Sequence, residues 1–166
     1  MIEGIIHSEN PEQHWEHIKA EGKTILDLGC GFWTEEERQK GDGTAKYFIG
    51  QNPTKYIGLD INAQDIQRLA VEFPQAVFIA APIRSPADIL ELLDKFKPQV
   101  IKCDIEGMEI ALLGLKDRQG IEQIAIESHY NNEGLLIEWM SRVRLNPWRI
   151  DKVSFCSQIK VLYGKC

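Results

Sequence analysis

The chain has 166 residues, of which 43% are hydrophobic and 27% are charged, proportions that are ordinary for a globular protein. Its net charge of -6 argues against nonspecific nucleic-acid binding, which depends on clusters of lysine and arginine. No apolar stretch approaches the roughly twenty residues that a membrane-spanning helix needs, so we expect no membrane partner.

A chain of this length can bury about 70% of the surface it exposes when unfolded, and we expect one domain over residues 1–166. The N-terminal residues lack a basic region followed by an apolar one, which predicts no signal peptide and a cytoplasmic location. The four cysteines are scattered and form no C-x-x-C pair, so we expect reduced thiols and no metal site built on cysteine: Cys30, Cys103, Cys156 and Cys166.

Five apolar runs read as strands, and segments with helical periodicity lie between them. This alternation predicts a parallel sheet with helices on both faces. The five runs are Thr24–Leu28, Tyr56–Asp60, Ala76–Ala80, Gln99–Asp104 and Gln123–Ser128.

The pattern changes after Ser128. One more helical stripe is followed by two strands, Trp148–Phe155 and Gln158–Tyr163, with a tight turn at Cys156–Ser157 that makes them antiparallel. The pattern predicts an α/β fold with a mostly parallel seven-stranded sheet. Five βα units closed by an antiparallel C-terminal hairpin resemble the outline of the common S-adenosylmethionine (SAM)-dependent methyltransferases. This resemblance implies a three-layer, Rossmann-like sandwich in which the strands, numbered along the chain, lie in the order 3-2-1-4-5-7-6.

The end of the first strand carries Asp27, Gly29 and Gly31. Glycines allow a ligand to approach the backbone closely. A carboxylate at Asp27 would repel the pyrophosphate of a dinucleotide, but it would attract the ammonium and sulfonium groups of SAM, which favours SAM as the cofactor. The alternative is that Asp27 is a structural acid that bonds loop amides.

Residues 32–43 read as an insertion between this strand and the next helix, because Trp33 stands where a third glycine is usual. Our hypothesis is that Gly41 and Gly43 restore the close backbone approach, with Thr44 as the N-cap of a helix over Ala45–Ile49. The alternative is a solvated acidic loop. Trp33 either covers the adenosine or the substrate, or packs as a plug.

Asp60 closes the second strand, where an acid can accept hydrogen bonds from both ribose hydroxyls. It follows Asp27 by 33 positions, and by 21 if residues 32–43 are an insertion, close to the spacing of about 20 expected for such an acid. A helix cap is the alternative role for Asp60. A ribose contact does not separate SAM from NAD, since both carry a ribose.

The fourth strand ends in Lys102-Cys103-Asp104-Ile105-Glu106-Gly107-Met108-Glu109. This segment resembles the K-x-D-x-E-G-x-E signature of the FkbM-type methyltransferases, and Ile124–His129 is similar to that family's fifth strand. The resemblance covers Lys23–Tyr130 and implies a SAM-dependent enzyme that methylates oxygen. The family's first motif usually reads D-x-G-A-N-x-G, from which this chain departs at Cys30–Gly43.

Two sets of site residues follow from these strand ends. The predicted cofactor contacts are Asp27, Gly29, Cys30, Gly31, Asp60, Ile61 and Asp104. The predicted catalytic residues are Asp104 and Glu106, nearest the methyl group, and Glu127 or His129 as general base. Glu106 also suits the first turn of a helix, and the four side chains could instead hold Mg²⁺ or a transition metal, although we predict no metal.

We thus predict a SAM-dependent methyltransferase that acts on a small-molecule or glycan acceptor. The acceptor is either small and held by an N-terminal helix, the 32–43 loop and the Tyr130–Gly134 loop, or large and met on an open face. A homodimer could complete the site. Two rivals remain: a SAM- or nucleotide-binding module without turnover, and an NAD-dependent reductase, which Asp27 and the C-terminal hairpin oppose.

Overall fold

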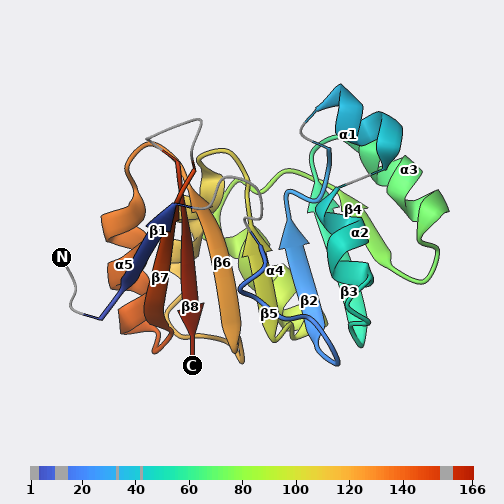
Figure 1. Cartoon of the computed structure of the whole chain (residues 1–166). Helices are drawn as coiled ribbons and strands as arrows, with labels where there is room; N and C mark the ends of the chain where they lie inside the picture. Colours follow the sequence, from blue (N-terminus) through green and yellow to red (C-terminus); the bar gives the residue numbers. More distant parts are fainter. Residues whose placement is uncertain (1–3, 10–14, 33, 42, 154–158) are drawn as a thin grey trace.

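The computed structural model describes residues 4–9, 15–32, 34–41, 43–153 and 159–166 (Figure 1). Its strands are β1 Ile6–Glu9, β2 Thr24–Leu28, β3 Lys55–Asp60, β4 Val77–Ala80, β5 Val100–Cys103, β6 Gln123–Ser128, β7 Asn146–Lys152 and β8 Lys160–Lys165. Its helices are α1 Glu35–Lys40, α2 Thr44–Ile49, α3 Ala63–Glu72, α4 Pro86–Phe96, the 3₁₀ helix η1 Met108–Gly114 and α5 Glu133–Arg142.

The strands form one sheet in the order β1-β7-β8-β6-β5-β2-β3-β4. The seven predicted strands therefore lie in the predicted order, and the predicted C-terminal hairpin is confirmed, since β8 runs antiparallel to both β6 and β7. The turn predicted at Cys156–Ser157 lies outside the described residues.

An eighth strand was not predicted. β1 pairs in parallel with the outer side of β7, and the expected N-terminal helix is absent from the described residues 4–9 and 15–32. The prediction failed here because β1 is only four residues long and carries no apolar run. Its stability comes from pairing with a strand some 140 positions later, as the register Ile6 to Arg149 shows.

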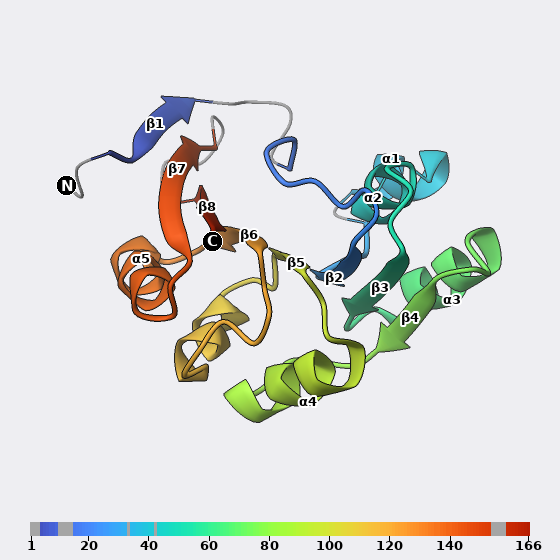
Figure 2. The same ribbon diagram turned by 90° about the horizontal axis from the view of Figure 1, so that it is seen from below.

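Helices cover both faces of the sheet (Figure 2). Helices α1, α2 and α3 lie on one face, and α4, η1 and α5 lie on the other. Alternate strand residues point to opposite faces, so Leu26 and Leu28 pack in the core under α4, η1 and α5, whereas Ile25 packs in the core under α2 and α3.

Local signals explain the helix ends. Asn62 caps α3, since its side chain accepts hydrogen bonds from the backbone N–H groups of Gln64 and Asp65. The predicted loop over residues 32–43 contains helix α1. Thr34 and Glu37 form a capping box at its start. A helix in this segment was not predicted, because α1 buries no residue and so shows no apolar stripe.

The sheet order creates one reversal beside β2. From β2 the chain moves outward through β3 and β4, and it then crosses back through α4 to β5 on the other side of β2. Ligands of open α/β sheets bind outside the carboxyl ends of the strands at such a point. These ends point upward in Figure 1 and carry the site described next.

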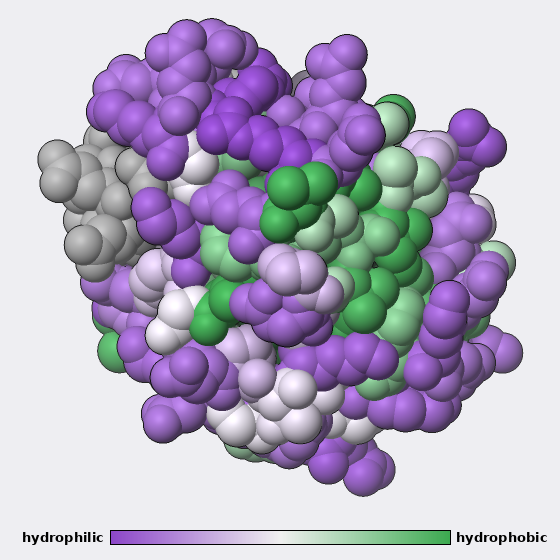
Figure 3. Space-filling view, turned by 90° about the vertical axis from the view of Figure 1, so that its right-hand side faces the viewer, coloured by the Kyte–Doolittle hydropathy of each residue, from purple (hydrophilic) through white to green (hydrophobic). Residues whose placement is uncertain are grey.

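The side of the molecule that carries α3 and β4 shows hydrophobic side chains gathered between polar ones (Figure 3). β4 is the edge strand here, and its first three residues, Val77, Phe78 and Ile79, are only partly buried. Among the described residues, no helix is long and apolar enough to cross a membrane.

Candidate ligand cleft at the strand ends

A cleft of about 350 Å³ opens at the carboxyl ends of β2, β3 and β5. This volume lies in the range of small-molecule sites, about 300–1,000 Å³. The lining residues are Gly29, Gly31, Phe32, Leu59, Asp60, Ile61, Ala81, Pro82, Ile83, Asp104, Ile105, Glu106 and Met108. The cleft is therefore mostly apolar, with carboxylates at Asp60, Asp104 and Glu106.

Gly29 brings β2 and β5 together at the floor of the cleft. Its φ of +80° lies in the left-handed region, and a Cβ at this position would stand 1.7 Å from the backbone oxygen of Asp104. The amides of Gly29 and Cys30 both donate to the carbonyl of Leu59, at 2.8 and 3.1 Å, which ties the same turn to β3. No side chain fits at Gly29, so the glycine is required by the backbone packing alone.

Asp60 is held at the cleft wall by two backbone amides. Gly31 N–H donates to Oδ2 at 2.9 Å, and Asn62 N–H donates to Oδ1 at 2.8 Å. Each carboxylate oxygen can accept a second hydrogen bond, so both remain able to receive a ligand hydroxyl. Because Asn62 caps α3, the alternative that Asp60 is only a helix cap is not supported.

Asp27 lies beneath the cleft and does not line it. Its side chain is fully buried, and its Oδ2 accepts hydrogen bonds from Thr44 Oγ1 at 2.8 Å and Tyr56 O–H at 2.6 Å. Its Oδ1 lies 3.2 Å from Lys102 Nζ. The geometry therefore supports a structural role, and the predicted contact of Asp27 with SAM remains a prediction.

Lys102 is fully buried beside Asp27, and sequence reasoning gave it no role. Its Nζ donates to the carbonyl of Gly29 at 2.5 Å and lies 3.6 Å from Asp104 Oδ2. Burial alone would lower the pKa of Lys102, but the charges of Asp27 and Asp104 outweigh burial and hold that pKa above its ordinary value. The ammonium group thus links the β2 turn to the end of β5.

The 32–43 segment is anchored by a buried carboxylate. Arg38 on α1 binds Asp65 on α3, with Nε 2.7 Å from Oδ1, and Phe32 N–H donates to Asp65 Oδ2 at 3.3 Å. Asp65 is 2% exposed. These bonds place the Phe32 ring in the cleft wall, although the run Glu35–Arg38 reads as purely solvated in the sequence.

The hypothesis of a split glycine loop is not supported by this arrangement. A Cβ at Gly41 would meet Glu72 on α3, and a Cβ at Gly43 would meet the Phe32 ring, so neither glycine faces the cleft. Gly43, and not Thr44, is the N-cap of α2, because the Thr44 hydroxyl is bound to Asp27 instead. Trp33 lies outside the described residues.

The predicted catalytic residues come together at the ends of β5 and β6. Asp104, Glu127 and His129 each offer one ligand-type atom, and these atoms lie within 4.8 Å of one another. His129 Nε2 is 3.5 Å from both Glu106 Oε2 and Glu127 Oε1. Asp104 and Glu106 line the cleft, whereas Glu127 and His129 are 9% and 6% exposed and lie behind them.

Glu109 also contacts this cluster, although it was not among the predicted site residues. It is fully buried on η1, its Oε1 accepts the backbone N–H of His129 at 2.7 Å, and the same oxygen lies 3.5 Å from His129 Nδ1. Burial alone would raise the pKa of Glu109, but the interactions with His129 lower it. The sequence offered one signal for a role of Glu109, since Glu109 is the last glutamate of the K-x-D-x-E-G-x-E segment.

Two pKa values in the cluster are shifted. Burial raises the pKa of Asp104 to about 6, and Glu127 adds to this rise while Lys102 opposes it. The carboxylates of Glu109 and Glu127 raise the pKa of His129 to about 10. The imidazole therefore already holds its second proton at neutral pH, which weighs against His129 as the general base and favours Glu127.

The predicted cofactor contacts divide into two groups. Gly29, Gly31, Asp60, Ile61 and Asp104 line the cleft, whereas Asp27 and Cys30 are fully buried. Burial also raises the pKa of the Cys30 thiol. Three lining residues were not predicted, namely Phe32, Pro82 and Ile83. They lie in loops, and the positions of these loops depend on the fold as a whole.

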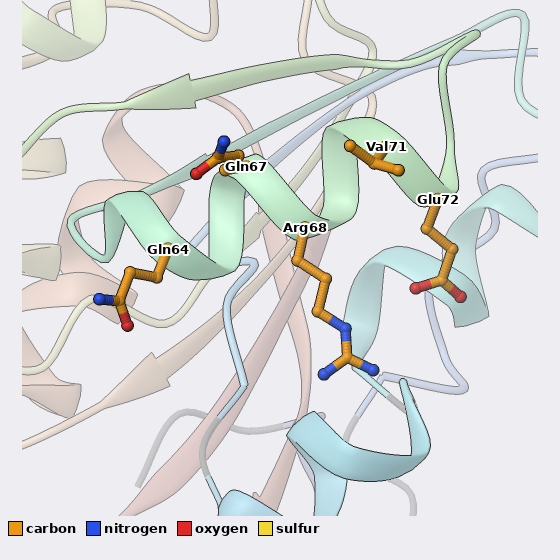
Figure 4. A pocket seen from close by; sticks show the side chains of 5 residues that line it. All are labelled: Gln64, Gln67, Arg68, Val71 and Glu72. Carbon is orange, nitrogen blue, oxygen red and sulfur yellow. The ribbon is translucent and has the colours of Figure 1, made fainter.

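A second hollow of about 460 Å³ lies along α3 (Figure 4). It is lined by Gln64, Gln67, Arg68, Val71 and Glu72, all from this helix. Arg68 and Glu72 extend from the same side of α3 in Figure 4, and the Arg68 guanidinium lies 5.4 Å from the centre of the Phe32 ring. Since no strand end contributes to it, the cleft beside β2 is the better candidate site.

Comparisons with known proteins agree on the fold. The sequence matches no model of a known protein family and no curated protein sequence. The structure is similar to that of an uncharacterised protein from Listeria monocytogenes (TM-score 0.60, 12% identity), covering 90% of this chain and 63% of that one. It is also similar to a SAM-dependent methyltransferase from Mesorhizobium loti (TM-score 0.58, 8% identity), covering 90% and 93%.

A third similar structure is fibrillarin from Aeropyrum pernix with natively bound SAM (TM-score 0.52, 11% identity), which covers 87% of this chain and 66% of that one. At these identities the likeness establishes the fold alone, and the resemblance to the FkbM type stays a prediction. The chain has the Rossmann-like α/β fold that SAM-dependent methyltransferases share.

Proposed function

We propose that this protein is a SAM-dependent methyltransferase of the FkbM type, which transfers a methyl group to an oxygen of a small-molecule or glycan acceptor. The observation that carries the proposal is Asp60, held by two amides with both oxygens available at the wall of a 350 Å³ cleft. The cleft lies at the sheet reversal, where open α/β sheets bind their ligands, and the similar fibrillarin structure contains natively bound SAM.

The lining of the cleft fits the parts of SAM. Asp60 accepts the ribose hydroxyls, and the apolar side chains of Phe32, Ile61 and Ile83 contact the adenine. Asp104 and Glu106 supply negative charge at the opposite end, where it stabilises the cationic end of SAM by about 1.5–3 kcal/mol per charge-assisted hydrogen bond.

SAM supplies a methyl group on a sulfonium, and the protein aligns the acceptor and excludes water. The acceptor oxygen attacks the methyl carbon, the carbon–sulfur bond breaks, and its electron pair stays on sulfur. The hydroxyl proton of the acceptor passes to Glu127, which lies behind the cleft acids at the end of β6.

Calorimetric titration with S-adenosylhomocysteine tests the cofactor. We expect micromolar binding to the wild type, at least about tenfold weaker binding to Asp60→Asn, which corresponds to about 1.4 kcal/mol, and no binding of NAD. Asp94→Asn is the matched control, because its carboxylate is 69% exposed on α4 and does not line the cleft. Tight NAD binding, or an Asp60→Asn affinity equal to that of wild type, would contradict the proposal.

Turnover separates an enzyme from a binding module. Labelled SAM and a panel of hydroxylated acceptors should give methyl transfer that Glu127→Gln abolishes while S-adenosylhomocysteine still binds. Cofactor binding without transfer to any acceptor in the panel would favour the module without turnover.

A further inference from the structure

The ends of β5 and β6 bring together a set of side chains that can hold a metal ion. Asp104 follows β5, and Glu127 and His129 lie at the end of β6, which pairs with β5 in parallel. Their ligand-type atoms lie within 4.8 Å of one another. Because strand pairing fixes these positions, the set exists without any bound molecule.

His129 gives an independent sign of a missing ligand. The residue is 6% exposed, and neither ring nitrogen has a hydrogen-bond partner within the described part of the chain. Its closest carboxylate oxygens stand at 3.5 Å, too far for a well-formed hydrogen bond. At neutral pH the imidazole carries two protons, so a metal ion must displace the proton on Nε2 in order to bind there. The ion would then give this buried nitrogen the bonding partner that it lacks.

Glu109 lies where the carboxylate partner of a metal-binding histidine usually lies. It holds the backbone N–H of His129 and faces Nδ1, so Nε2 points toward Glu127. Histidines that bind metals usually donate their other ring N–H to a carboxylate or carbonyl, which fixes the tautomer. The other oxygen of Glu109, Oε2, is buried and also has no hydrogen-bond partner among the described residues.

The distances and the charges fit a divalent ion. Two ligands about 2.1 Å from one ion stand about 3.5 Å apart at a near-tetrahedral angle, and this is the separation of His129 Nε2 from Glu127 Oε1. The ligand-type atoms of Asp104, Glu127 and His129 lie within 4.8 Å of one another. The side chain of Asp104 is 28% exposed, so it can rotate to bring its carboxylate oxygen within bonding distance of the ion. Acidic groups outnumber basic ones here: Lys102 and His129 are two positive groups, and five carboxylates lie within ion-pair distance of them, those of Asp27, Asp104, Glu106, Glu109 and Glu127.

We propose that the protein binds one divalent transition-metal ion, Mn²⁺ or Zn²⁺, through Asp104, Glu127 and His129. One imidazole and two carboxylates suit these ions better than Mg²⁺, which prefers oxygen ligands. Since Asp104 also lines the cleft, the ion borders the space in which a ligand of the cleft lies. Metal binding is measured without a nucleoside and does not depend on the proposed methyl transfer. A carboxylate that holds the ion cannot also take the acceptor's proton, so Glu127 acts as the base only in the metal-free protein.

Calorimetry on chelator-treated full-length protein tests this, with MnCl₂, ZnCl₂ and MgCl₂ as titrants and no nucleoside present. We expect one Mn²⁺ or Zn²⁺ per chain, weaker Mg²⁺ binding, and at least a tenfold loss of affinity in His129→Gln and in Glu127→Gln. His17→Gln is the matched control, because His17 also lies near two carboxylates, Glu16 and Asp151. No binding to the wild type, or equal affinity in wild type and His129→Gln, would overturn the proposal.

A second measurement on the wild type guards against variants that fail to fold. Zn²⁺ is added to protein labelled with ¹⁵N in its four histidines, and the imidazole signals are assigned. The proposal predicts that one equivalent of Zn²⁺ shifts the ring nitrogens of His129. Shifts confined to His7, His14 and His17 would mean that the ion binds elsewhere and would overturn it.

Discussion

The cleft has one end at β2 and β3 and another at β5 and β6, and the two ends differ in how their carboxylates are paired. At the ends of β2 and β3, each acid has its partners: Asp27 contacts Lys102, Thr44 and Tyr56, and Asp60 accepts two amides. At the ends of β5 and β6, four carboxylates surround His129 and share it. At the first end the buried charge of Asp27 is paired with Lys102. At the second end more carboxylates than positive groups lie within ion-pair distance, which favours a positively charged ligand.

This difference separates positions that build the fold from positions that can act on a ligand. A change at Asp27 or Lys102, which are buried beneath the cleft, should affect stability first and binding as a consequence. A change at the β6 end should affect binding or pH dependence while the sheet stays intact.

The largest effect is expected at Lys102. Lys102→Met leaves the buried carboxylate of Asp27 without its counter-charge, which should destabilise the protein by about 3–5 kcal/mol in urea unfolding. Lys116→Met, at an exposed position, is the control and should change stability by less than about 0.5 kcal/mol. Adding Asp27→Asn to Lys102→Met should recover part of the loss, and a double variant as unstable as the sum of the single ones would contradict the pairing.

A somewhat smaller loss is expected for Gly29→Ala. The new Cβ would overlap the Asp104 carbonyl, and the backbone would be strained at φ +80°, which together should cost on the order of 3 kcal/mol. Gly120→Ala provides the comparison, because φ there is +86° but no atom lies within 4 Å. That variant should lose only about 1–2 kcal/mol from strain, and equal losses in the two variants would argue against the close packing at Gly29.

The pH dependence of stability tests the β6 end. In the metal-free protein the pKa of His129 is raised from 6.5 to about 10, so the stabilisation it provides is complete below pH 6.5 and is lost as pH rises toward 10. Between pH 7 and pH 9 the wild type should therefore lose about 2 kcal/mol more than His129→Gln, measured by urea unfolding with a chelator present. Parallel curves for the two proteins would contradict the charged histidine.

The smallest effect concerns the anchor of α1. Arg38→Gln removes the guanidinium bound to Asp65, so α1 should exchange its amide hydrogens faster, and S-adenosylhomocysteine should bind a few-fold more weakly because Phe32 loses support. Lys40→Gln, at an exposed pair with Glu36 on the same helix, should leave both values unchanged. An unchanged exchange rate in Arg38→Gln would show that Asp65 does not hold the segment.

The predictable parts of the fold were those with a strong local pattern. Buried β-branched runs bounded by polar residues gave β2 and β6 their correct limits, 24–28 and 123–128. β1 and α1 lack such a pattern, since one is held by a distant strand and the other buries nothing. The sequence does mark the two ends of α1, by the capping box of Thr34 and Glu37 and by Gly41 at the C-terminus. A search for apolar residues at helical spacing does not detect these end signals.

The sequence predicted which strand ends carry the site residues, but it did not predict which side chains contact one another there. Asp60 and Asp104 were placed correctly at the cleft because parallel strands end at one edge of a sheet. The partner of Asp27 was not found, although the predicted strand order already placed the first and fourth strands side by side. In the observed register Asp27 stands directly opposite Lys102, a pairing that only the alignment of the two strands reveals.

A crystal structure with S-adenosylhomocysteine tests the central claim most directly. The nucleoside should lie in the cleft at the ends of β2, β3 and β5, with both ribose hydroxyls on Asp60 and the sulfur on the side of Asp104 and Glu106. A nucleoside bound along α3 at Arg68, or bound without contact to Asp60, would contradict it.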